Sequence, residues 1–431
     1  MLNPLLSPIL IASIAGVLLG FIQHGNHFLT KIHRTEQIWT DINYALIISI
    51  FYGGAALGAL VGRHPTDRLG GPRTLLVSGL AYCVSSIVII LNEDLNAFLI
   101  ARFAGGFALG LCTVAAPLYI AELCPRGLRG RLTAVFPAGI AAGYLVFLPI
   151  RMRYTGSVTS PWSFFVGIES AIAFTLAFLS LYLPDSPRWL IRVQRDKLAA
   201  REAWCRLMPD ASKDEIDKRL VAIEQTVDSA TKKRFWTWKQ AGPIQLVIGL
   251  ALFSQFAGFA PQVAFAGYSS ILEETNSGML STFSIVGTYL GFSLLAMNMI
   301  DGVGRKPLLA LGAWGSIIFL GLGYCFFSME TYELLWVCTY GFLASYSIGI
   351  ATVFWVYIAE IFPLDLRARG QALGCFIYWL TGFLLSMFLA YTGENIDMGW
   401  AFQVYAVLFA IQLIWILVFV KESMGRSLDD I

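Results

Sequence analysis

The sequence predicts an all-α membrane protein with twelve transmembrane helices in two pseudo-symmetric six-helix bundles. Three observations predict this fold class. The chain of 431 residues is 57% apolar and only 13% charged, it contains twelve apolar runs of spanning length, and its two halves share a repeated motif. A water-soluble chain of this length needs far more polar surface, so lipid is the expected solvent here.

The apolar runs have the length that a bilayer demands. At a rise of ~1.5 Å per residue, crossing ~30 Å of hydrocarbon takes about 20 mostly apolar residues. The first run begins almost at Met1. It lacks the basic stretch and small-residue cleavage site of a signal peptide, so we interpret it as a retained span. The predicted spans are 9–28, 43–61, 75–91, 97–122, 132–150, 164–183, 244–272, 280–300, 307–327, 334–360, 371–391 and 401–420.

A polar interval divides these spans into six and six. Within it, residues 196–207 and 213–227 have the pattern of short amphipathic helices on a surface. The expected organisation is an N-terminal bundle over 1–183, a linker over 184–243, a C-terminal bundle over 244–420 and a tail over 421–431.

The distribution of positive charge predicts the orientation. With both termini on the cytoplasmic side, 25 of the 30 Lys and Arg residues lie in cytoplasmic segments, four lie outside, and Arg102 lies within a span. Loops rich in Lys and Arg stay in the cytoplasm. We therefore expect a multi-pass protein with both termini cytoplasmic and a cytoplasmic linker. The plasma membrane is the preferred location, an organelle membrane is the alternative, and a monomer is the expected functional unit.

Composition also argues against several kinds of chemistry. The net charge of +2 is spread in short clusters, which leaves no basic face for a nucleic acid. The seven cysteines are scattered singly and there are only four histidines, so neither a disulfide framework nor a metal site is expected. No nucleophile with a base and no phosphate loop is evident in the sequence, so we expect no cofactor and no enzymatic activity.

An internal repeat relates the two halves. The sequence YIAELCP at 119–125 recurs as YIAEIFP at 357–363, and in each copy two arginines follow the glutamate at the same spacing. Upstream, DRLG at 67–70 has its counterpart in DGVG at 301–304, again between the second and third spans of its half. Two related halves with a binding site between them are typical of transporters that work by rocking.

The repeated charges predict ion pairs at the cytoplasmic ends of the spans. Glu122 and Glu360 end apolar runs, where an unpaired carboxylate is costly, and a cation follows each at a fixed spacing. We expect pairs between helices or halves that hold this face shut, although Arg131 and Arg369 could simply anchor helix ends. The residues expected in these gating pairs are Glu122, Arg129, Glu360, Arg367, Asp67, Arg68, Asp301, Arg305 and Arg102.

These motifs resemble those of the sugar porter family of the major facilitator superfamily, which includes facilitative glucose transporters and bacterial sugar symporters. DRLG and DGVGRKP (301–307) look like the family's two DRxGRR turns. PDSPRWL (184–190) is similar to its PESPRWL segment, and ESMGRSL (422–428) to its C-terminal PETKGRSL. RFAGG (102–106) is similar to its fourth-helix signature. So many matches in the right order are specific. The resemblance implies the major facilitator fold, alternating access and a central cavity for a sugar or polyol.

The resemblance also implies a binding site. A sugar needs polar groups for its hydroxyls and an aromatic face for its CH surface. Gln255 matches the family's second sugar-binding Gln, and Trp355 and Trp379 match its tenth-helix and eleventh-helix Trp. Packing in the core or against lipid is the alternative for the two Trp, and pairing with another helix is the alternative for Gln255. Further positions that replace the family's polar ligands are Ser254, Tyr378, Tyr289 and Ser347.

Other positions depart from the family pattern. Ala260 occupies the usual Asn position, and Pro137 stands where the family has a sugar-binding Gln. A proline supplies no side-chain hydrogen bond there and frees a backbone carbonyl. The prolines of the family's GPxPW pattern are absent from ATVFW (351–355), so the sequence does not predict the usual hinge in the tenth span.

Coupling to protons is the least determined property. Ile22 stands where proton-coupled members carry an Asp opposite the fourth-helix Arg, whereas Arg102 is kept. His24 and Glu169 are the candidates for a relocated proton site, and an ordinary histidine at the pore mouth is the alternative for His24.

We therefore expect facilitative uniport of a hexose or a related sugar or polyol, with proton symport as the second interpretation. The further alternatives are a carrier of a non-sugar small molecule and a non-transporting nutrient sensor. In each case the expected partners are a small molecule and the lipid bilayer.

Overall fold

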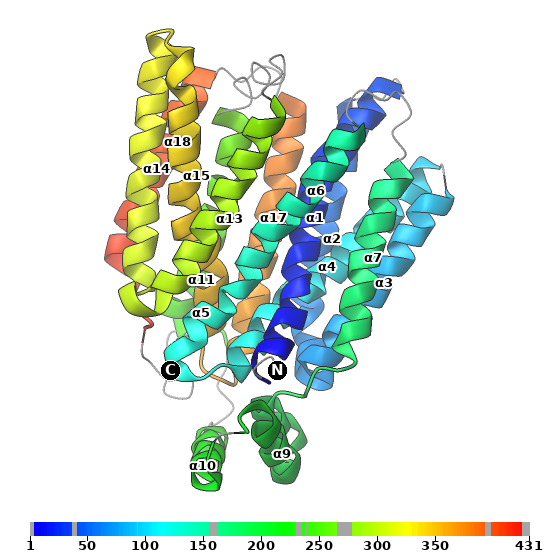
Figure 1. Cartoon of the computed structure of the whole chain (residues 1–431), viewed down its shortest axis with the longest axis vertical. Helices are drawn as coiled ribbons and strands as arrows, with labels where there is room; N and C mark the ends of the chain where they lie inside the picture. Colours follow the sequence, from blue (N-terminus) through cyan, green and yellow to red (C-terminus); the bar gives the residue numbers. More distant parts are fainter. Residues whose placement is uncertain are drawn as a thin grey trace.

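The computed structural model describes residues 4–36, 41–92, 94–154, 162–209, 211–229, 235–237, 240–264, 278–392 and 398–424. Twelve of the helical segments in this part of the chain are long and apolar enough to cross a membrane. They stand side by side as one tall bundle (Figure 1). The twelve-span all-α fold predicted from the apolar runs is confirmed.

The first six spans use seven helices. The fifth span is built from a short helix that is followed almost directly by a long one. The helices are α1 (Leu6–Glu36), α2 (Asp41–Leu69), α3 (Gly71–Leu91), α4 (Leu95–Leu123), α5 (Arg129–Thr133), α6 (Val135–Tyr154) and α7 (Trp162–Ser180). We call these helices the N half.

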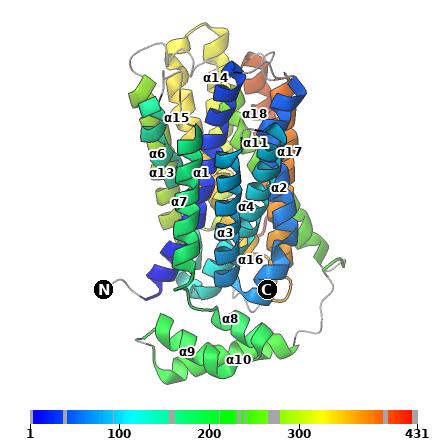
Figure 2. The same ribbon diagram turned by 90° about the vertical axis from the view of Figure 1, so that its right-hand side faces the viewer.

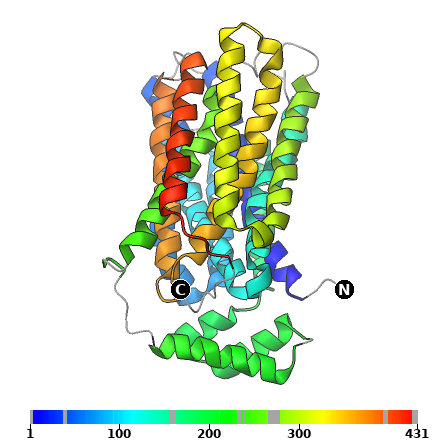
Figure 3. The same ribbon diagram turned by 90° about the vertical axis from the view of Figure 1, so that its left-hand side faces the viewer.

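The last six spans form the C half, drawn in green to red in Figure 3. The tenth span consists of four helical pieces, the first of which is the 3-10 turn η4 (Tyr332–Leu334). The helices are α11 (Ala241–Ala264), α13 (Gly278–Val303), α14 (Arg305–Ser328), α15 (Leu335–Tyr346), the π-helical turn η5 (Ser347–Ala351), α16 (Thr352–Glu360), α17 (Arg367–Thr392) and α18 (Met398–Phe419).

Between the halves, the chain forms a small helical layer at one end of the bundle. It contains α8 (Pro187–Trp189), the π-helical turn η2 (Leu190–Gln194), α9 (Lys197–Leu207) and α10 (Lys213–Ser229). Asp196 caps α9 by accepting a hydrogen bond from the Ala199 amide at 2.9 Å. Figure 2 shows this layer at the end of the bundle where α1 begins. We call that end the linker face.

Two tight turns at the linker face repeat between the halves. Gly70 separates α2 from α3 with a φ of 83°, and Gly304 separates α13 from α14 with a φ of 102°. Side chains other than glycine rarely adopt these backbone angles. Each glycine thus allows two long spans to be joined by a single residue, which explains why it belongs to the repeated DRLG and DGVG motifs.

The tenth span is hinged although its prolines are missing. Gly349, inside η5, departs from helical geometry with φ −87° and ψ −112°. A Cβ atom on Gly349 would lie 2.8 Å from the Cα of Gly312 in α14, so only glycines permit this close approach. The Thr352 hydroxyl donates to the Ser347 carbonyl at 2.7 Å, so this carbonyl at the break in the helix has a hydrogen-bond donor. The hinge therefore comes from glycine packing.

The halves pack on each other mainly through two helix pairs, α2 with α17 and α6 with α13. The largest buried apolar cluster extends across this contact and includes Phe136, Trp355 and Trp379. On the outside of the bundle, apolar side chains are exposed at helical spacing, such as Val407, Ile411 and Ile414 of α18. An apolar outer surface is expected where the solvent is lipid.

Candidate transport site and linker-face gate

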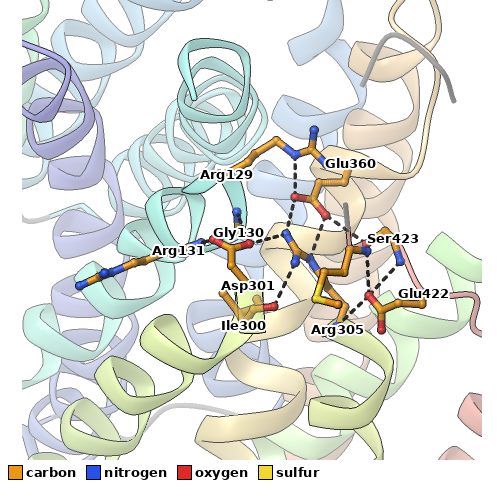
Figure 4. A network of polar contacts seen from close by, with 10 residues as sticks. Arg129, Gly130, Arg131, Ile300, Asp301, Arg305, Glu360, Glu422 and Ser423 are labelled. Atoms are coloured by element: carbon orange, nitrogen blue, oxygen red, sulfur yellow. Dashed lines mark hydrogen bonds and ion pairs between the residues drawn. The ribbon is translucent and has the colours of Figure 1, made fainter. Parts of the chain in front are cut away.

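Glu360 is the centre of a buried ion cluster at the linker face (Figure 4). Its carboxylate, at the end of α16, is fully buried. Oε1 accepts from Nε of Arg129 in the N half at 2.8 Å and from Nη2 of Arg305 at 3.0 Å. Oε2 accepts from Arg305 Nε at 3.1 Å and from the Ser423 hydroxyl at 3.1 Å. One carboxylate therefore joins the two halves.

Asp301 makes a second connection between the halves. It lies at the end of α13 and accepts hydrogen bonds from the backbone amides of Gly130 and Arg131 at 3.0 and 2.8 Å. These amides belong to the first turn of α5 in the N half, where N–H groups lack partners within the helix. Asp301 also pairs with Arg305 at 3.0 Å. A carboxylate of one half thus caps a helix of the other.

The C-terminal motif braces the same region. Glu422 accepts hydrogen bonds from the backbone amides of Arg305 and Lys306, both at 3.0 Å, at the start of α14. Arg305 also donates to the Ile300 carbonyl at 3.0 Å. The segment that follows α18 therefore holds the N-terminus of α14 in place and orients the arginine that pairs with Glu360.

The partners of the repeated carboxylates differ from those expected. Glu360 pairs with Arg129 and Arg305 and not with the cation at fixed spacing, Arg367, which is fully buried at the start of α17. Glu122 is 5% exposed, and no ion pair holds it within the described residues. Arg68 is exposed and forms no ion pair there either. Ion pairs of Glu122 and Arg68 therefore stay predictions.

Asp67 binds the linker. Its carboxylate pairs with Arg192 at 2.8 Å, and its carbonyl accepts from the Trp189 indole at 2.8 Å. Arg192 also donates to the carbonyl of Leu364, which precedes α17 in the C half, at 2.9 Å. Arg192 could not be predicted from the sequence, because nothing in a charged linker distinguishes one arginine among thirteen cations.

Deeper in the bundle, the halves meet where Pro117 interrupts the hydrogen bonding of α4. Proline has no N–H, so the carbonyl four residues earlier, at Thr113, has no helical donor. Gln371 and Cys375 of α17 donate to that carbonyl at 3.3 and 3.4 Å, and Trp379 donates to the Thr113 hydroxyl at 3.1 Å. Residues at positions i, i+4 and i+8 of α17 thus dock on one residue of α4.

Aromatic side chains of the C half continue from this contact. Tyr378 stacks on Phe354 with ring centroids 5.3 Å apart, and its ring lies 5.2 Å from Trp355 and 5.1 Å from Trp379. Trp379 is fully buried and lies 5.9 Å from Tyr52 of the N half. Three of the four aromatic residues that the family resemblance placed in the site are therefore neighbours at the interface between the halves.

Gln255 lies beside this cluster with an unused donor. Its side chain is 4% exposed, and Nε2 is buried without a hydrogen-bond acceptor among the described residues. A Cβ atom on Gly382 of α17 would lie 2.4 Å from Nε2 and 3.3 Å from the ring of Tyr52, so the amide faces α17 next to the N half. Ser254 is buried on the same helix.

A second aromatic group is centred on Tyr289 of α13. Tyr289 has its ring 5.7 Å from Tyr144 of the N half and 6.1 Å from Tyr346. Tyr144 donates to Gln23 of α1 at 2.8 Å. Ser347 donates its hydroxyl to the Leu343 carbonyl of its own helix at 2.5 Å, so it supports the hinge, and a ligand would have to replace that bond. Ala260 lies outside the residues whose side chains the structure describes.

Arg102 and Glu169 form a polar site within the N half. The Arg102 guanidinium lies 4.9 Å from the ring centroid of Phe51. Glu169 is 1% exposed and accepts a hydrogen bond from the Tyr82 hydroxyl at 2.8 Å. Its Oε1 has no donor among the described residues, and a Cβ atom on Gly25 of α1 would lie 3.1 Å from it. The side chain of His24 lies outside the described residues.

Two packed helical halves, joined by ion pairs at one end and by polar and aromatic side chains at the centre, define a membrane transporter. A family model described as "Sugar (and other) transporter" matches residues 11–431. The chain therefore belongs to this family of transporters, and the resemblance drawn from the motifs is confirmed.

Individual relatives agree with this assignment. The chain is 27% identical to the glucose transport protein of a Synechocystis strain over 457 aligned residues, which cover 97% of this chain and 95% of the relative. It is 26% identical to the arabinose-proton symporter of Bacillus subtilis, with 97% and 92% covered.

Among solved structures, the proton:xylose symporter XylE bound to 6-bromo-6-deoxy-D-glucose has a TM-score of 0.89 at 22% identity. The alignment covers 99% of this chain and 98% of that chain. An inward-open structure of the xylose transporter XylE from E. coli has a TM-score of 0.75, also at 22% identity. These similarities show the major facilitator fold.

Proposed function

We propose that the protein carries a hexose or a related sugar or polyol across a membrane by alternating access, as a facilitative uniporter. The unused donor of Gln255 carries this proposal. A buried donor without an acceptor is costly, and a substrate hydroxyl between the halves relieves that cost. Trp379 and Tyr378 lie beside it and supply the apolar face that a sugar ring requires.

The linker-face gate supports alternating access. Arg129 and Glu360 belong to different halves and lie 2.8 Å apart, so opening this face must separate a buried ion pair. The partners are re-solvated in the open state, which offsets part of the lost interaction. A gate of this kind stabilises the closed linker face without making it permanent, and substrate bound between the halves shifts the balance.

The proposal also covers the orientation of the protein in the membrane and its functional oligomeric state. Placing 25 of the 30 Lys and Arg residues in cytoplasmic segments makes the linker face cytoplasmic. The proposed cavity between the halves is built within one chain, so a monomer is sufficient for transport. We place the protein in the plasma membrane.

Proton symport is the second candidate, and Glu169 favours it. A buried carboxylate with one oxygen that has no donor among the described residues is suited to bind and release a proton. Uniport is preferred because Ile22 of α1, which stands where proton-coupled members of the family carry an Asp, cannot bind a proton.

Counterflow in liposomes tests the proposed function. Purified protein is reconstituted, loaded with unlabelled glucose, xylose or a polyol, and diluted into trace labelled sugar. We expect transient accumulation of label without any ion gradient. Accumulation of a non-sugar solute alone would reassign the substrate, and a lack of exchange with any solute would indicate a sensor.

The same liposomes separate uniport from symport. We expect no alkalinisation of the outer medium when sugar enters, and no change in counterflow between Glu169→Gln and the unsubstituted protein. Sugar-driven proton uptake that is lost in Glu169→Gln but kept in Tyr82→Phe would establish symport through Glu169 instead.

A further inference from the structure

Gln23 is a polar side chain inside the first apolar run of the chain. It belongs to α1 and is half-buried. A polar group at this depth in a membrane requires hydrogen-bond partners. Its Oε1 accepts from the Tyr144 hydroxyl of α6 at 2.8 Å, and its amide also contacts the Tyr378 side chain of α17. Gln23 therefore touches the N half and the C half at once.

Close packing of α1 on α6 fixes the position of this amide. A Cβ atom on Gly20 of α1 would collide with the backbone of α6, and one on Gly143 of α6 would collide with the backbone of α1. Small residues at such a crossing let two helix backbones approach closely. Gln23 lies about one turn beyond Gly20, and Tyr144 follows Gly143 directly. The bond between Gln23 and Tyr144 is thus held by the backbones on both sides.

Gln23 and Gln255 reach the same face of α17 from opposite halves. Gln23 contacts Tyr378. The Nε2 atom of Gln255 lies against Gly382. Positions 378 and 382 are neighbours on one helix face, about 5–6 Å apart, because they are separated by four residues. The two amides are therefore close enough to bind different hydroxyls of one sugar ring.

Pro137 leaves α6 without the amide that the family resemblance places there. Tyr144 follows Pro137 by seven residues, which is two turns along the same face of α6. The amide that Tyr144 holds therefore lies over the face on which the ligand is missing. An amide has one acceptor oxygen and two N–H donors. Because Tyr144 bonds the oxygen of Gln23, its N–H groups are the part that a substrate can use.

We propose that Gln23 is the substrate-binding amide of the N half and donates to a different sugar hydroxyl from the one bound by Gln255. This inference rests on the proposed sugar transport. A substrate that bridges the two amides stabilises the state in which both halves enclose it. The donor comes from α1 and not from α6, so it approaches the ring from another helix. Gln23 therefore determines which sugars are selected at that hydroxyl.

Uptake of deoxy sugars into liposomes tests this role. The KM is measured for D-glucose and each of its monodeoxy analogues, or for D-xylose and its analogues where counterflow selects the pentose. In the unsubstituted protein, removing the hydroxyl that Gln23 binds should raise the KM about fivefold, as expected for one hydrogen bond to a half-buried donor. In Gln23→Met, the KM for the parent sugar should rise by the same factor, and this one analogue should no longer differ from it.

A purely structural role, in which Gln23 only joins α1 to α6, gives a different result. Tyr144→Phe removes the bond between these helices but keeps the amide. This variant should raise the KM less than Gln23→Met and still discriminate against the deoxy analogue. If Gln23→Met instead raises the KM for the parent sugar and all analogues equally, and keeps the discrimination, Gln23 does not bind substrate.

Gln412→Met is the matched control, since Gln412 is a buried amide of α18, a helix that packs mainly on α14 and α11. It should keep the selectivity of the unsubstituted protein. If Gln23→Met does not fold, Gln23→Asn, which draws the amide back by one methylene, should show the same loss of selectivity. A KM that responds to Gln255→Ala but not to the Gln23 variants overturns the role of Gln23 and leaves sugar transport intact. Absence of sugar exchange in the unsubstituted protein overturns both.

Discussion

The two copies of the repeated motif have nearly the same sequence but very different surroundings. Glu360 holds Arg129, Arg305 and Ser423 together in a buried cluster, whereas Glu122 has no ion pair among the described residues. Asp301 caps a helix of the opposite half, but its counterpart Asp67 binds the linker. The copy of the duplicated sequence in the C half therefore forms the gate, and the copy in the N half contacts the linker.

This asymmetry teaches that the closed linker face depends mainly on the C half. Its carboxylates reach across to the N half, while the N half offers Arg129 and the amides of α5. The N half instead supports the linker layer, through Asp67, and through Asp185 paired with Arg73 at 3.4 Å. Substitutions at equivalent positions should consequently have unequal effects.

The largest difference is expected between Glu360→Gln and Glu122→Gln. Removing the charge of Glu360 leaves Arg129 and Arg305 buried without their carboxylate, which costs about 3–5 kcal/mol. The linker face should open, and Cys375, which is fully buried on α17, should react with a maleimide ~100-fold faster or more. Glu122→Gln should change that rate little.

The control for this measurement is Cys375→Ser in each background, which identifies the labelled site because Cys205 and Cys325 are exposed in any state. Equal labelling of the Glu360 and Glu122 variants, with both proteins still folded, would show that the gate does not depend on the C half.

A smaller effect is expected for Asp301→Asn against Asp67→Asn. Asp301 accepts two backbone amides across the interface, and weakening these bonds should cost about 1–3 kcal/mol of the closed state. Asp67 is 38% exposed, so its pair with Arg192 is screened by solvent and contributes about 1 kcal/mol or less. Maleimide labelling of Cys375 again measures both. If Cys375 is labelled as fast in Asp67→Asn as in Asp301→Asn, the contact of Asp67 with the linker stabilises the closed face as strongly as the Asp301 cap on α5.

In the proposed transport site, a substitution in the C half should also have a larger effect than one in the N half. Gln255→Ala removes a direct contact and should raise the KM for sugar about tenfold, corresponding to ~1.4 kcal/mol. Thr113→Val, in the N half, removes the hydroxyl that accepts from the Trp379 indole and donates to the Gly110 carbonyl. Because this hydroxyl acts on the site only through Trp379, the KM of that variant should rise severalfold less. Initial rates of labelled-sugar uptake at several concentrations provide the test. An unchanged KM in Gln255→Ala would remove this residue from the site.

The smallest difference concerns the ends of the halves. Glu422 caps the first amides of α14, and Glu422→Gln should lower stability by about 1 kcal/mol. Asp185→Asn should cost less, because Arg73 is 56% exposed and solvent screens the pair. Differential scanning calorimetry of both variants measures this ranking. A larger loss for Asp185→Asn would indicate that the linker layer carries more of the stability than its contacts suggest.

Sequence alone determined the number of spans, the polar linker and the glycines at the two tight turns. Each of these features depends on local chemistry: a run of apolar residues must leave water, and a turn with positive φ requires glycine. The same reasoning identified Glu360, because a charged group at the end of an apolar run must be compensated. Asp301 was identified through the internal repeat, and Gln255 through the family resemblance.

Only the tertiary structure decided which partner compensates each group. Glu360 and Arg129 are 231 residues apart in the chain, and many cations could satisfy the same carboxylate. The hinge at Gly349 was not predicted because it depends on Gly312 of a neighbouring helix. The docking of α17 on Thr113 likewise needs the carbonyl that Pro117 frees. The cost of burying a charge or an unbonded carbonyl is a local property, but packing determines where its partner comes from.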